Sequence, residues 1–152
     1  MNIIIRKAAE TDFAAIYSLI KEFAVFQKTP QKVSITVEEM KAQKDLFECF
    51  VAVNNKEEII GFASCFFAYY SWSGKAFYLD DLYVKESYRG YKTGTRLLET
   101  VIDFAKKSGC IKVRWQVSNW NKNAIAFYKK MGAIIDDVEI NCDLDLRSLN
   151  AE

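Results

Sequence analysis

The stretch from Tyr88 to Thr95 reads YRGYKTGT and decides which fold this chain adopts. It follows an apolar, aromatic-rich segment, Ala76 to Val84, and precedes a segment whose apolar residues recur every three or four positions from Leu97 to Ala105. These patterns predict a strand before the loop and a helix after it, ending at Gly109. Another strand is predicted from Ile111 to Val117, so the helix can cross over to a parallel neighbouring strand. We expect the ligand at this crossover.

The loop has the features of a phosphate-binding segment. It ends at the predicted helix N-terminus, where unpaired backbone N–H groups and the helix dipole attract anions. Arg89 and Lys92 add two positive charges. The loop lacks the GK[ST] ending of a Walker loop and the GxGxxG pattern of a dinucleotide site. An ordinary turn between a strand and a helix is the alternative interpretation.

The N-terminal part of the chain predicts one strand and two helices. The strand is expected from Asn2 to Arg6, and an amphipathic helix follows from Asp12 to Phe26. Thr36 and Glu39 have the spacing of a capping box, so a second helix should begin there and run to about Lys44.

The middle and the end of the chain carry several strand signals. The segments Phe47 to Val53 and Glu58 to Tyr70 are rich in aromatic and β-branched residues, which predicts an antiparallel hairpin. A short helix is predicted from Asn123 to Met131. One or two closing strands are predicted after it, from Gly132 to Asp136 and from Val138 to Leu146.

This order of elements predicts an α+β fold with a mixed, mostly antiparallel sheet, helices on both faces and one parallel crossover. The chain shows no internal repeat, low-complexity run or linker-like stretch. Residues 1–152 are therefore expected to form a single domain.

Composition excludes several classes of function. The 21 Lys and Arg residues nearly balance 20 Asp and Glu residues, so no overall field favours nucleic acid or an anionic membrane. The sequence contains no His, which removes histidine bases, and its four Cys residues form no CxxC pair, so we expect no metal. Charged residues interrupt the N-terminal segment, so no secretory signal is expected and a cytoplasmic location is predicted.

The loop and three further stretches resemble the GNAT (Gcn5-related) acetyltransferases. Arg89 and Gly94 match the R/Q-x-x-G-x-G/A pattern of the family's pyrophosphate loop, with Lys92 in place of the first glycine. The other stretches are YLDDLYV at residues 78–84, NWN at 119–121 and FYKKMGA at 127–133. Within the superfamily the chain is most similar to the diamine acetyltransferases, the spermidine/spermine and thialysine N-acetyltransferases.

The resemblance implies a GNAT-like fold with acetyl-CoA, and no metal, at the parallel crossover. In the family, the loop holds the pyrophosphate, a strand backbone pairs with the pantetheine arm, and later residues also contact the cofactor. The matching positions here are Arg89, Gly90, Tyr91, Lys92, Thr93, Gly94 and Thr95 in the loop, Leu82, Tyr83 and Val84 in the strand, and Asn121 and Tyr128 beyond them. A turn or helix cap is the alternative role for Asn121.

The resemblance also assigns two catalytic roles. Tyr128 occupies the position that protonates the departing thiolate, a task that suits a neutral phenol. Asp80 occupies the position that contacts the amine and relays its proton. Asp80 and Asp81 are consecutive, so a regular strand would direct them to opposite faces. Core packing for Tyr128, and edge-strand or β-bulge charges for the two aspartates, are the alternative interpretations.

The acceptor is expected to be a primary amine of a small molecule. The linker after the first helix is acidic in polyamine acetylators, whereas it reads QKTPQK from Gln27 to Lys32 here, which predicts poor use of spermine. An amino acid with a side-chain amine fits better, because its carboxylate could pair with Lys28 or Arg114. The candidate substrate contacts are Gln27, Lys28, Asp80, Asp81, Arg114 and Gln116.

Three further expectations complete the prediction. The acetyl group is expected to move by direct attack within a ternary complex, without a covalent enzyme intermediate. The resemblance implies a homodimer to which the strands after Gly132 contribute. Two alternative functions are a catalytically weak CoA-binding regulatory module and a peptide or protein N-acetyltransferase.

Overall fold

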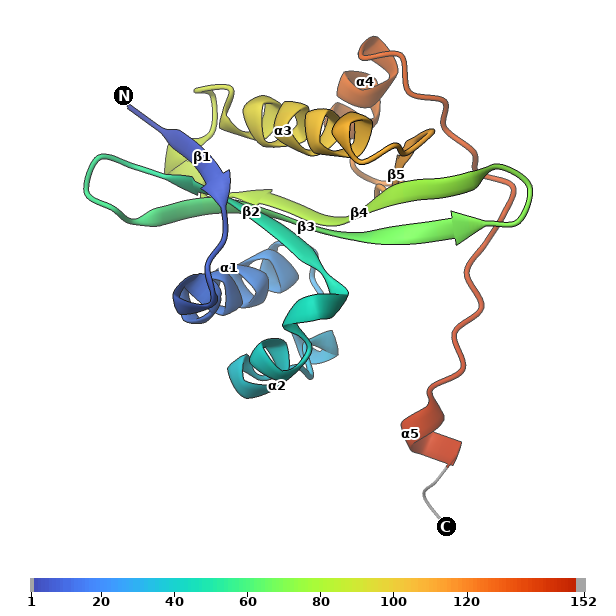
Figure 1. Ribbon diagram of the computed structural model, residues 1–152, viewed down its shortest axis with the longest axis horizontal. Helices are drawn as coiled ribbons and strands as arrows, with labels where there is room; N and C mark the ends of the chain where they lie inside the picture. The colour runs from blue at the N-terminus through green and yellow to red at the C-terminus, as the bar shows by residue number, and fades with distance from the viewer. Residues whose placement is uncertain (1, 150–152) are drawn as a thin grey trace. The chain divides into compact units, whose positions relative to one another are not determined.

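The computed structural model describes residues 2–149, and Figure 1 shows their arrangement. Five strands form one sheet in the order of the sequence. The first three neighbouring pairs are antiparallel, and the fourth pair is parallel. The strands are β1 (Ile4–Lys7), β2 (Glu48–Val53), β3 (Ile59–Tyr70), β4 (Gly74–Val84) and β5 (Val113–Trp115). This confirms the predicted mixed sheet and its parallel crossover.

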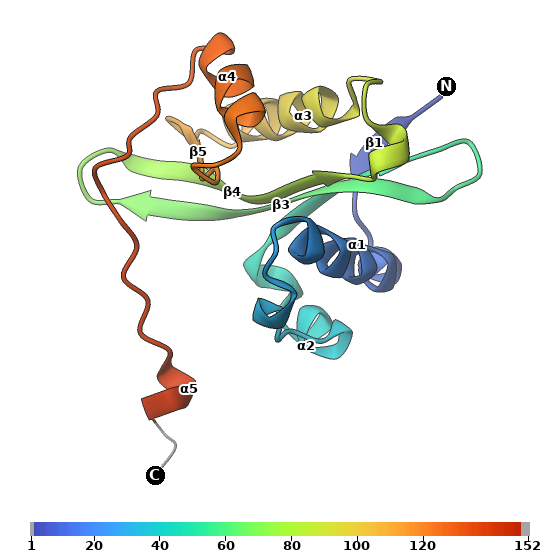
Figure 2. The ribbon, with the colours of Figure 1, turned by 180° about the vertical axis from the view of Figure 1, so that it is seen from behind.

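Helices cover both faces of this sheet. The helices α1 (Phe13–Phe26) and α2 (Val37–Ala42) lie on one side and α3 (Thr93–Lys107) lies on the other, as Figure 1 and the rear view in Figure 2 both show. The apolar face of α1 packs on Val51 and Phe62 of the sheet. From α3, the Phe104 ring packs at 5.3 Å from the Phe77 ring. Burial of these two apolar layers against the sheet stabilises the fold.

The caps and boundaries of the helices follow from local chemistry. The Thr36 hydroxyl accepts a hydrogen bond from the Glu39 N–H (3.2 Å), as the capping box predicts. The helix α3 begins at Thr93, inside the segment that the sequence suggested was loop, after a short 3₁₀ turn at Glu86–Tyr88. The last residues of the predicted loop therefore form the first turn of a helix.

The strand β5 is shorter than predicted, because β4 turns away from it. Only Phe77–Leu79 of β4 pair with Val113–Trp115. A bulge interrupts the register between β3 and β4, where Ser64 pairs with Asp81 but Cys65 pairs with Leu79. Asp80 is the extra residue, and such a bulge bends and twists its strand. The two strands therefore separate beyond Leu79.

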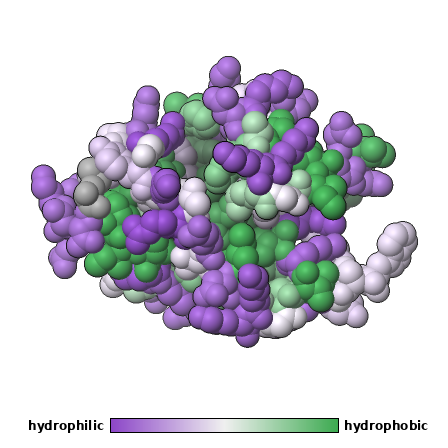
Figure 3. Space-filling view, turned by 90° about the horizontal axis from the view of Figure 1, so that it is seen from above, coloured by the Kyte–Doolittle hydropathy of each residue, from purple (hydrophilic) through white to green (hydrophobic). Residues whose placement is uncertain are grey.

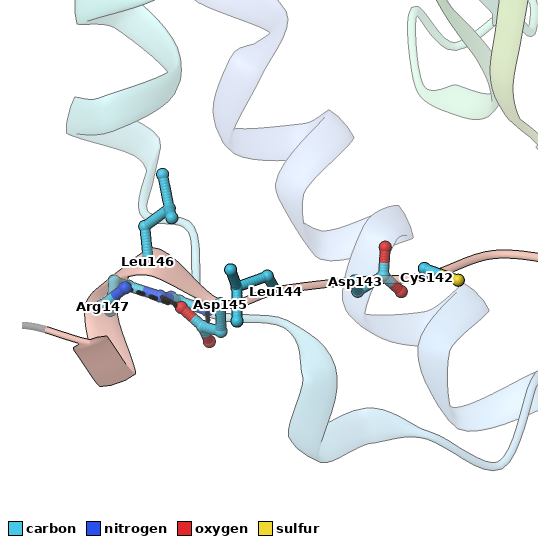
Figure 4. Close-up of a pocket in the computed structure, with 6 residues that line it drawn as sticks. All are labelled: Cys142, Asp143, Leu144, Asp145, Leu146 and Arg147. Carbon is cyan, nitrogen blue, oxygen red and sulfur yellow. Dashed lines mark hydrogen bonds and ion pairs between the residues drawn. The ribbon is translucent and has the colours of Figure 1, made fainter.

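The prediction of closing strands after Gly132 is wrong for the residues that the structure describes. Residues 132–145 form no strand, and a single helical turn, α5 (Leu146–Leu149), follows them. A strand requires a partner for its N–H and C=O groups, and the apolar side chains that alternate along this segment are exposed instead, with Ile134 at 96% and Ile140 at 83%. Figure 4 shows Cys142–Arg147, where Arg147 bonds back to Asp145.

The chain divides into two compact units, which are described separately below. The first runs to Gln116 and holds the sheet and α1 to α3, and the second begins at Val117 and holds α4 (Lys122–Lys130) and α5. The single domain over residues 1–152 stays a prediction, and Met1 and residues 150–152 lie outside the described residues. Within residues 2–149, none of the helices has the length and hydropathy that a bilayer-spanning segment needs.

Candidate active site

The N-terminus of α3 presents a group of backbone donors. The first hydrogen bond within the helix runs from the Arg96 N–H to the Lys92 carbonyl (3.0 Å). The N–H groups of Thr93, Gly94 and Thr95 precede it and so have no helical acceptor four residues back. They lie at the positive end of the dipole of a 15-residue helix. This arrangement suits a phosphate group.

Two residues of the loop adopt backbone conformations that turn the chain into this helix. Gly90 has φ of 89°, and Lys92, which caps α3, has φ of 60° and ψ of 19°. The left-handed conformation costs a non-glycine residue about 1–2 kcal/mol. Lys92 thus holds, under strain, a backbone conformation that glycine adopts without this cost.

Thr93 leaves a polar atom without a partner beside these donors. The residue is 2% exposed, and its Oγ1 has no hydrogen-bond partner among residues 2–149. A buried hydroxyl without a partner costs free energy. The hydroxyl is therefore a local defect in the first turn of α3.

The Arg89 side chain points back onto the protein. Its Nε donates a hydrogen bond to the Val84 carbonyl (3.0 Å), and its guanidinium carbon lies 5.1 Å from the centre of the Phe26 ring and 5.5 Å from that of the Tyr83 ring. These contacts connect the loop to the end of β4 and to the end of α1. Arg89 thus positions the loop, and its charge lies over two aromatic rings.

Two anchoring contacts near the loop were missed by the sequence reasoning. The Tyr83 hydroxyl donates to the Glu22 carboxylate (2.6 Å), and burial together with Glu22 raises the pKa of Tyr83 to about 12. Asn54 donates from Nδ2 to the Tyr88 hydroxyl (2.9 Å). Glu22 and Asn54 lie far from the loop in sequence, so only the fold brings them to it.

The outer edge of β4 lies open beyond the bulge. The Lys85 N–H donates to the Ile60 carbonyl of β3 (2.9 Å). Backbone N–H and C=O groups alternate between the two edges of a strand, so those of Tyr83 also point to β3. The backbone groups of Leu82 and Val84 point to the opposite edge. Within the described residues, β5 pairs with this edge only as far as Leu79. Leu82 and the Val84 N–H therefore keep the geometry expected for pairing with an extended ligand, whereas the Val84 carbonyl accepts from Arg89 Nε and the backbone of Tyr83 faces β3.

Asp80 and Asp81 lie at the bulge, where β4 and β5 separate. The bulge breaks the alternation that the sequence reasoning assumed for these two residues. Burial, and then the charge of Asp80, raise the pKa of Asp81 from 3.8 to about 6. Burial raises the pKa of Asp80 as well. The two carboxylates are therefore better proton acceptors than ordinary aspartates.

The remaining predicted substrate contacts lie on different elements. Arg114 of β5 pairs in register with Tyr78 of β4, and its guanidinium carbon lies 4.5 Å from the centre of the Tyr70 ring. Gln116 follows on the same segment, past the end of β5. Gln27 caps the C-terminus of α1, and Lys28 adopts a left-handed conformation with φ of 63°.

The second unit holds Asn121 and Tyr128. Asn121 caps α4, because its Oδ1 accepts a hydrogen bond from the Ala124 N–H (3.3 Å), which is the alternative role given to it above. Tyr128 lies on α4, and burial raises the pKa of its phenol, so the hydroxyl keeps its proton at neutral pH. Residues 2–149 contain no cluster of three or more His, Cys, Asp or Glu side chains that could hold a metal.

Two solved acetyltransferases are among the structures that share this architecture. An aminoglycoside acetyltransferase from an uncultured soil metagenomic sample superposes with a TM-score of 0.79 at 20% identity, covering 94% of this chain and 97% of its own. An acetyltransferase of Trypanosoma brucei superposes with a TM-score of 0.75 at 20% identity, covering 94% of this chain and 100% of its own. The chain therefore has the same fold as these two proteins.

Sequence comparison identifies the family. Residues 13–133 match the model of the acetyltransferase (GNAT) family, and the chain belongs to this family of acetyl-transferring enzymes. Thialysine N-epsilon-acetyltransferase of Mus musculus is 34% identical over 140 residues, which is 85% of this chain and 82% of that protein. L-ornithine N5-acetyltransferase of Arabidopsis thaliana is 36% identical over 113 residues, which is 74% of this chain and 47% of that protein.

Proposed function

We propose that this protein transfers acetyl from acetyl-CoA to a primary amine of a small molecule. The observation that carries the proposal is the N-terminus of α3, with three backbone N–H groups and Lys92, next to the open edge of β4. A pyrophosphate suits the helix N-terminus, and an extended pantetheine arm suits the backbone of Leu82 and Val84. Both parts of acetyl-CoA thus have a partner of the right chemistry.

The reaction moves protons at both reacting atoms. The substrate ammonium loses its first proton to Asp80, directly or through water, and the free amine attacks the thioester carbonyl. A C–N bond forms, the C–S bond breaks and the thiolate leaves with the proton of the Tyr128 phenol. The nitrogen gives up its second proton as the amide forms, water carries it back to the Tyr128 phenolate, and Asp80 returns its proton to solvent. No covalent intermediate with the protein is needed, and both substrates are bound at once.

The names of the relatives and the positive charges after α1 both support a small amine, rather than a long polycation, as the acceptor. The relatives are named for thialysine and ornithine, which bear side-chain amines. Lys28 and Lys32 follow α1, and they would repel a long polycation. Spermine is therefore proposed to be a poor acceptor, and diamines and lysine-like amino acids better ones.

The proposal is tested by thiol release from acetyl-CoA with polyamines, diamines, lysine-like amino acids and short peptides, against a blank with protein alone. Release that depends on a small amine is the expected result. Release only with peptides would favour a peptide N-acetyltransferase. Silence with every amine, together with calorimetric binding of acetyl-CoA, would favour the regulatory module, for which the lysine at position 92 is the supporting observation.

A homodimer formed by the C-terminal segment is part of the proposal. Residues 138–146 read VEINCDLDL, a strict alternation of apolar and polar residues that is typical of a half-buried strand. Its apolar side chains are exposed, and Figure 3 shows other apolar side chains, in green, reaching the surface in separate patches. Pairing with a second copy would bury this face. The four unpaired thiols fit a reducing, cytoplasmic location.

Light scattering tests the dimer. The wild-type chain should have the mass of a dimer, and Ile140→Asp, which charges the apolar face, should give a monomer. Asn141→Asp changes the polar face of the same segment and should remain a dimer. A monomeric wild-type protein would overturn this part of the proposal.

A further inference from the structure

One face of the β3–β4 hairpin carries a row of aromatic side chains. The Phe67 ring packs against Phe77 and against Phe104 of α3, so it faces α3. Strand residues alternate between faces, so Phe66 and Tyr70 face the other way. The Phe66 ring stacks on Tyr78 at 5.0 Å. This second face is the one that α1 covers further along the strands, at Phe62.

Two cations lie over the Tyr70 ring on this face. The Lys112 Nζ is 4.7 Å from the ring centre, and the Arg114 guanidinium carbon is 4.5 Å from it. No ion pair within residues 2–149 includes either side chain. Two like charges held against one ring without a carboxylate nearby form a site that attracts an anion.

Carboxylates lie a short way along the same strands. Arg114 pairs with Tyr78, and Asp81 pairs with Ser64, whose side chain shares the face of Phe66 and Tyr70. At a rise of about 3.3 Å per residue, two to three residues separate Tyr78 from the aspartates by about 7 to 10 Å. Burial, and then the charge of Asp80, raise the pKa of the Tyr78 phenol, and the charge of Arg114 acts to lower it.

We infer that Arg114 and Lys112 bind the α-carboxylate of an amino-acid acceptor whose side-chain amine reaches Asp80 and Asp81. This inference rests on the proposed function and narrows its acceptor to one class. An α-amino acid with a terminal amine presents a negative group at one end and a positive group at the other. The face carries the opposite charges in the same order, and the strand rise places Tyr78, beside Arg114, about 7 to 10 Å from the aspartates.

The same cations select against diamines. A diamine would direct its second ammonium to the place where the amino acid carries its carboxylate, and there it would meet Lys112 and Arg114. Repulsion of this kind gives specificity together with the attraction of the correct group. Arg114 is thus a specificity-determining residue, because its guanidinium can bind a carboxylate through two parallel hydrogen bonds.

Lysine and 1,5-diaminopentane, which differ only in the carboxylate, provide the test. The wild-type protein should use lysine with the higher kcat/KM. Arg114→Gln should lower kcat/KM for lysine about tenfold or more, mainly through KM, and leave that for the diamine unchanged or higher. Arg114→Glu should reverse the preference, and Lys112→Gln should shift it in the same direction as Arg114→Gln.

Lys75→Gln is the matched control. Lys75 also lies over an aromatic ring, at 4.7 Å from the centre of Phe67, but on the face towards α3. This variant should keep the wild-type preference. Equal losses with both acceptors in Arg114→Gln, or no loss, would overturn the inference.

Calorimetry separates this inference from the proposed function. If no amine releases thiol, the proposed function fails, and titration of lysine into the complex with CoA still decides the inference. Wild-type binding that is weakened in Arg114→Gln supports the carboxylate site. Binding of lysine that does not change in the variant, or no binding at all, would contradict it.

Discussion

The Tyr83 hydroxyl donates a hydrogen bond to the Glu22 carboxylate over 2.6 Å and so joins β4 to the last turns of α1. The Arg89 guanidinium lies over the ring of the same tyrosine and over Phe26. The loop before α3, which is proposed to bind pyrophosphate, is therefore positioned by a contact between residues 61 positions apart in sequence. A change in this contact should act on cofactor binding at a distance from the cofactor.

Tyr83→Phe should lower the stability of the protein and its affinity for acetyl-CoA. Loss of a hydrogen bond to a charged group should lower the free energy of unfolding by about 1.5–3 kcal/mol, measured by chemical denaturation. The KM for acetyl-CoA should rise with little change in kcat, because the loop is displaced and the reacting groups are not. A fall in kcat at unchanged KM would contradict the positioning role.

Two variants of Lys92 separate the effect of its backbone strain from the effect of its charge. Lys92→Gly should be more stable than Lys92→Ala by about 1 kcal/mol, because only the alanine keeps the cost of the left-handed conformation. Both variants lose the ammonium, so both should raise the KM for acetyl-CoA several-fold through loss of a charge-assisted contact. Equal stability of the two variants would show that the backbone relaxes at this position.

Thr93→Val should stabilise the protein. Valine has nearly the shape of threonine and removes a hydroxyl that is buried without a partner. The free energy of unfolding should therefore rise by about 1 kcal/mol, and the midpoint of thermal unfolding should rise with it. Thr100→Val, which changes a half-buried threonine of the same helix whose hydroxyl donates to the Arg96 carbonyl (2.9 Å), should give no such gain. A loss of stability in Thr93→Val would mean that the hydroxyl is satisfied in solution.

The raised pKa of Asp81 makes the free energy of unfolding depend on pH. Its pKa is about 6 in the folded chain and 3.8 ordinarily, so the folded state binds the proton more tightly. The free energy of unfolding should therefore fall as pH rises through this interval. Asp81→Asn should remove this dependence and stabilise the protein at neutral pH by about 1–2 kcal/mol, while weakening use of a cationic acceptor.

Asp45→Asn, which changes an exposed carboxylate, is the control for this pH experiment. It should leave the pH profile of stability unchanged. A profile of Asp81→Asn that coincides with that of the wild type would contradict the raised pKa.

Tyr128→Phe should lower kcat much more than affinity for acetyl-CoA. The phenylalanine keeps the ring and removes the proton that the leaving thiolate needs. Loss of a general acid typically costs about 10²- to 10⁴-fold in rate. Equal losses in kcat and in calorimetric affinity for acetyl-CoA, or no loss of kcat, would contradict the assigned role.

Local patterns predicted most of the fold. The apolar spacing of Phe13, Ile16 and Leu19 predicts the buried face of α1, and these residues are buried. The Thr36 cap and the hairpin of β2 and β3 also depend on neighbours in sequence, and both are confirmed. Such features are encoded within a few residues, so the sequence alone reveals them.

The features that the sequence did not reveal depend on register and on distant contacts. A bulge was only an alternative interpretation for Asp80 and Asp81, because it exists only where β3 and β4 pair with one residue in excess. The Glu22 and Asn54 contacts join segments that only the fold brings together. The segment from Val138 to Leu146 has a strand pattern, but a strand forms only with a partner. The position of the loop between β4 and α3 was therefore predicted, whereas the contacts that hold this loop were not.

The most direct test of the account is the product of the reaction. The protein, acetyl-CoA and lysine should together release one thiol for each molecule of lysine acetylated at its side-chain nitrogen, measured by thiol titration and nuclear magnetic resonance of the product. Thiol release that does not depend on the amine, or release without an N-acetylated product, would contradict the transfer of acetyl to an amine acceptor.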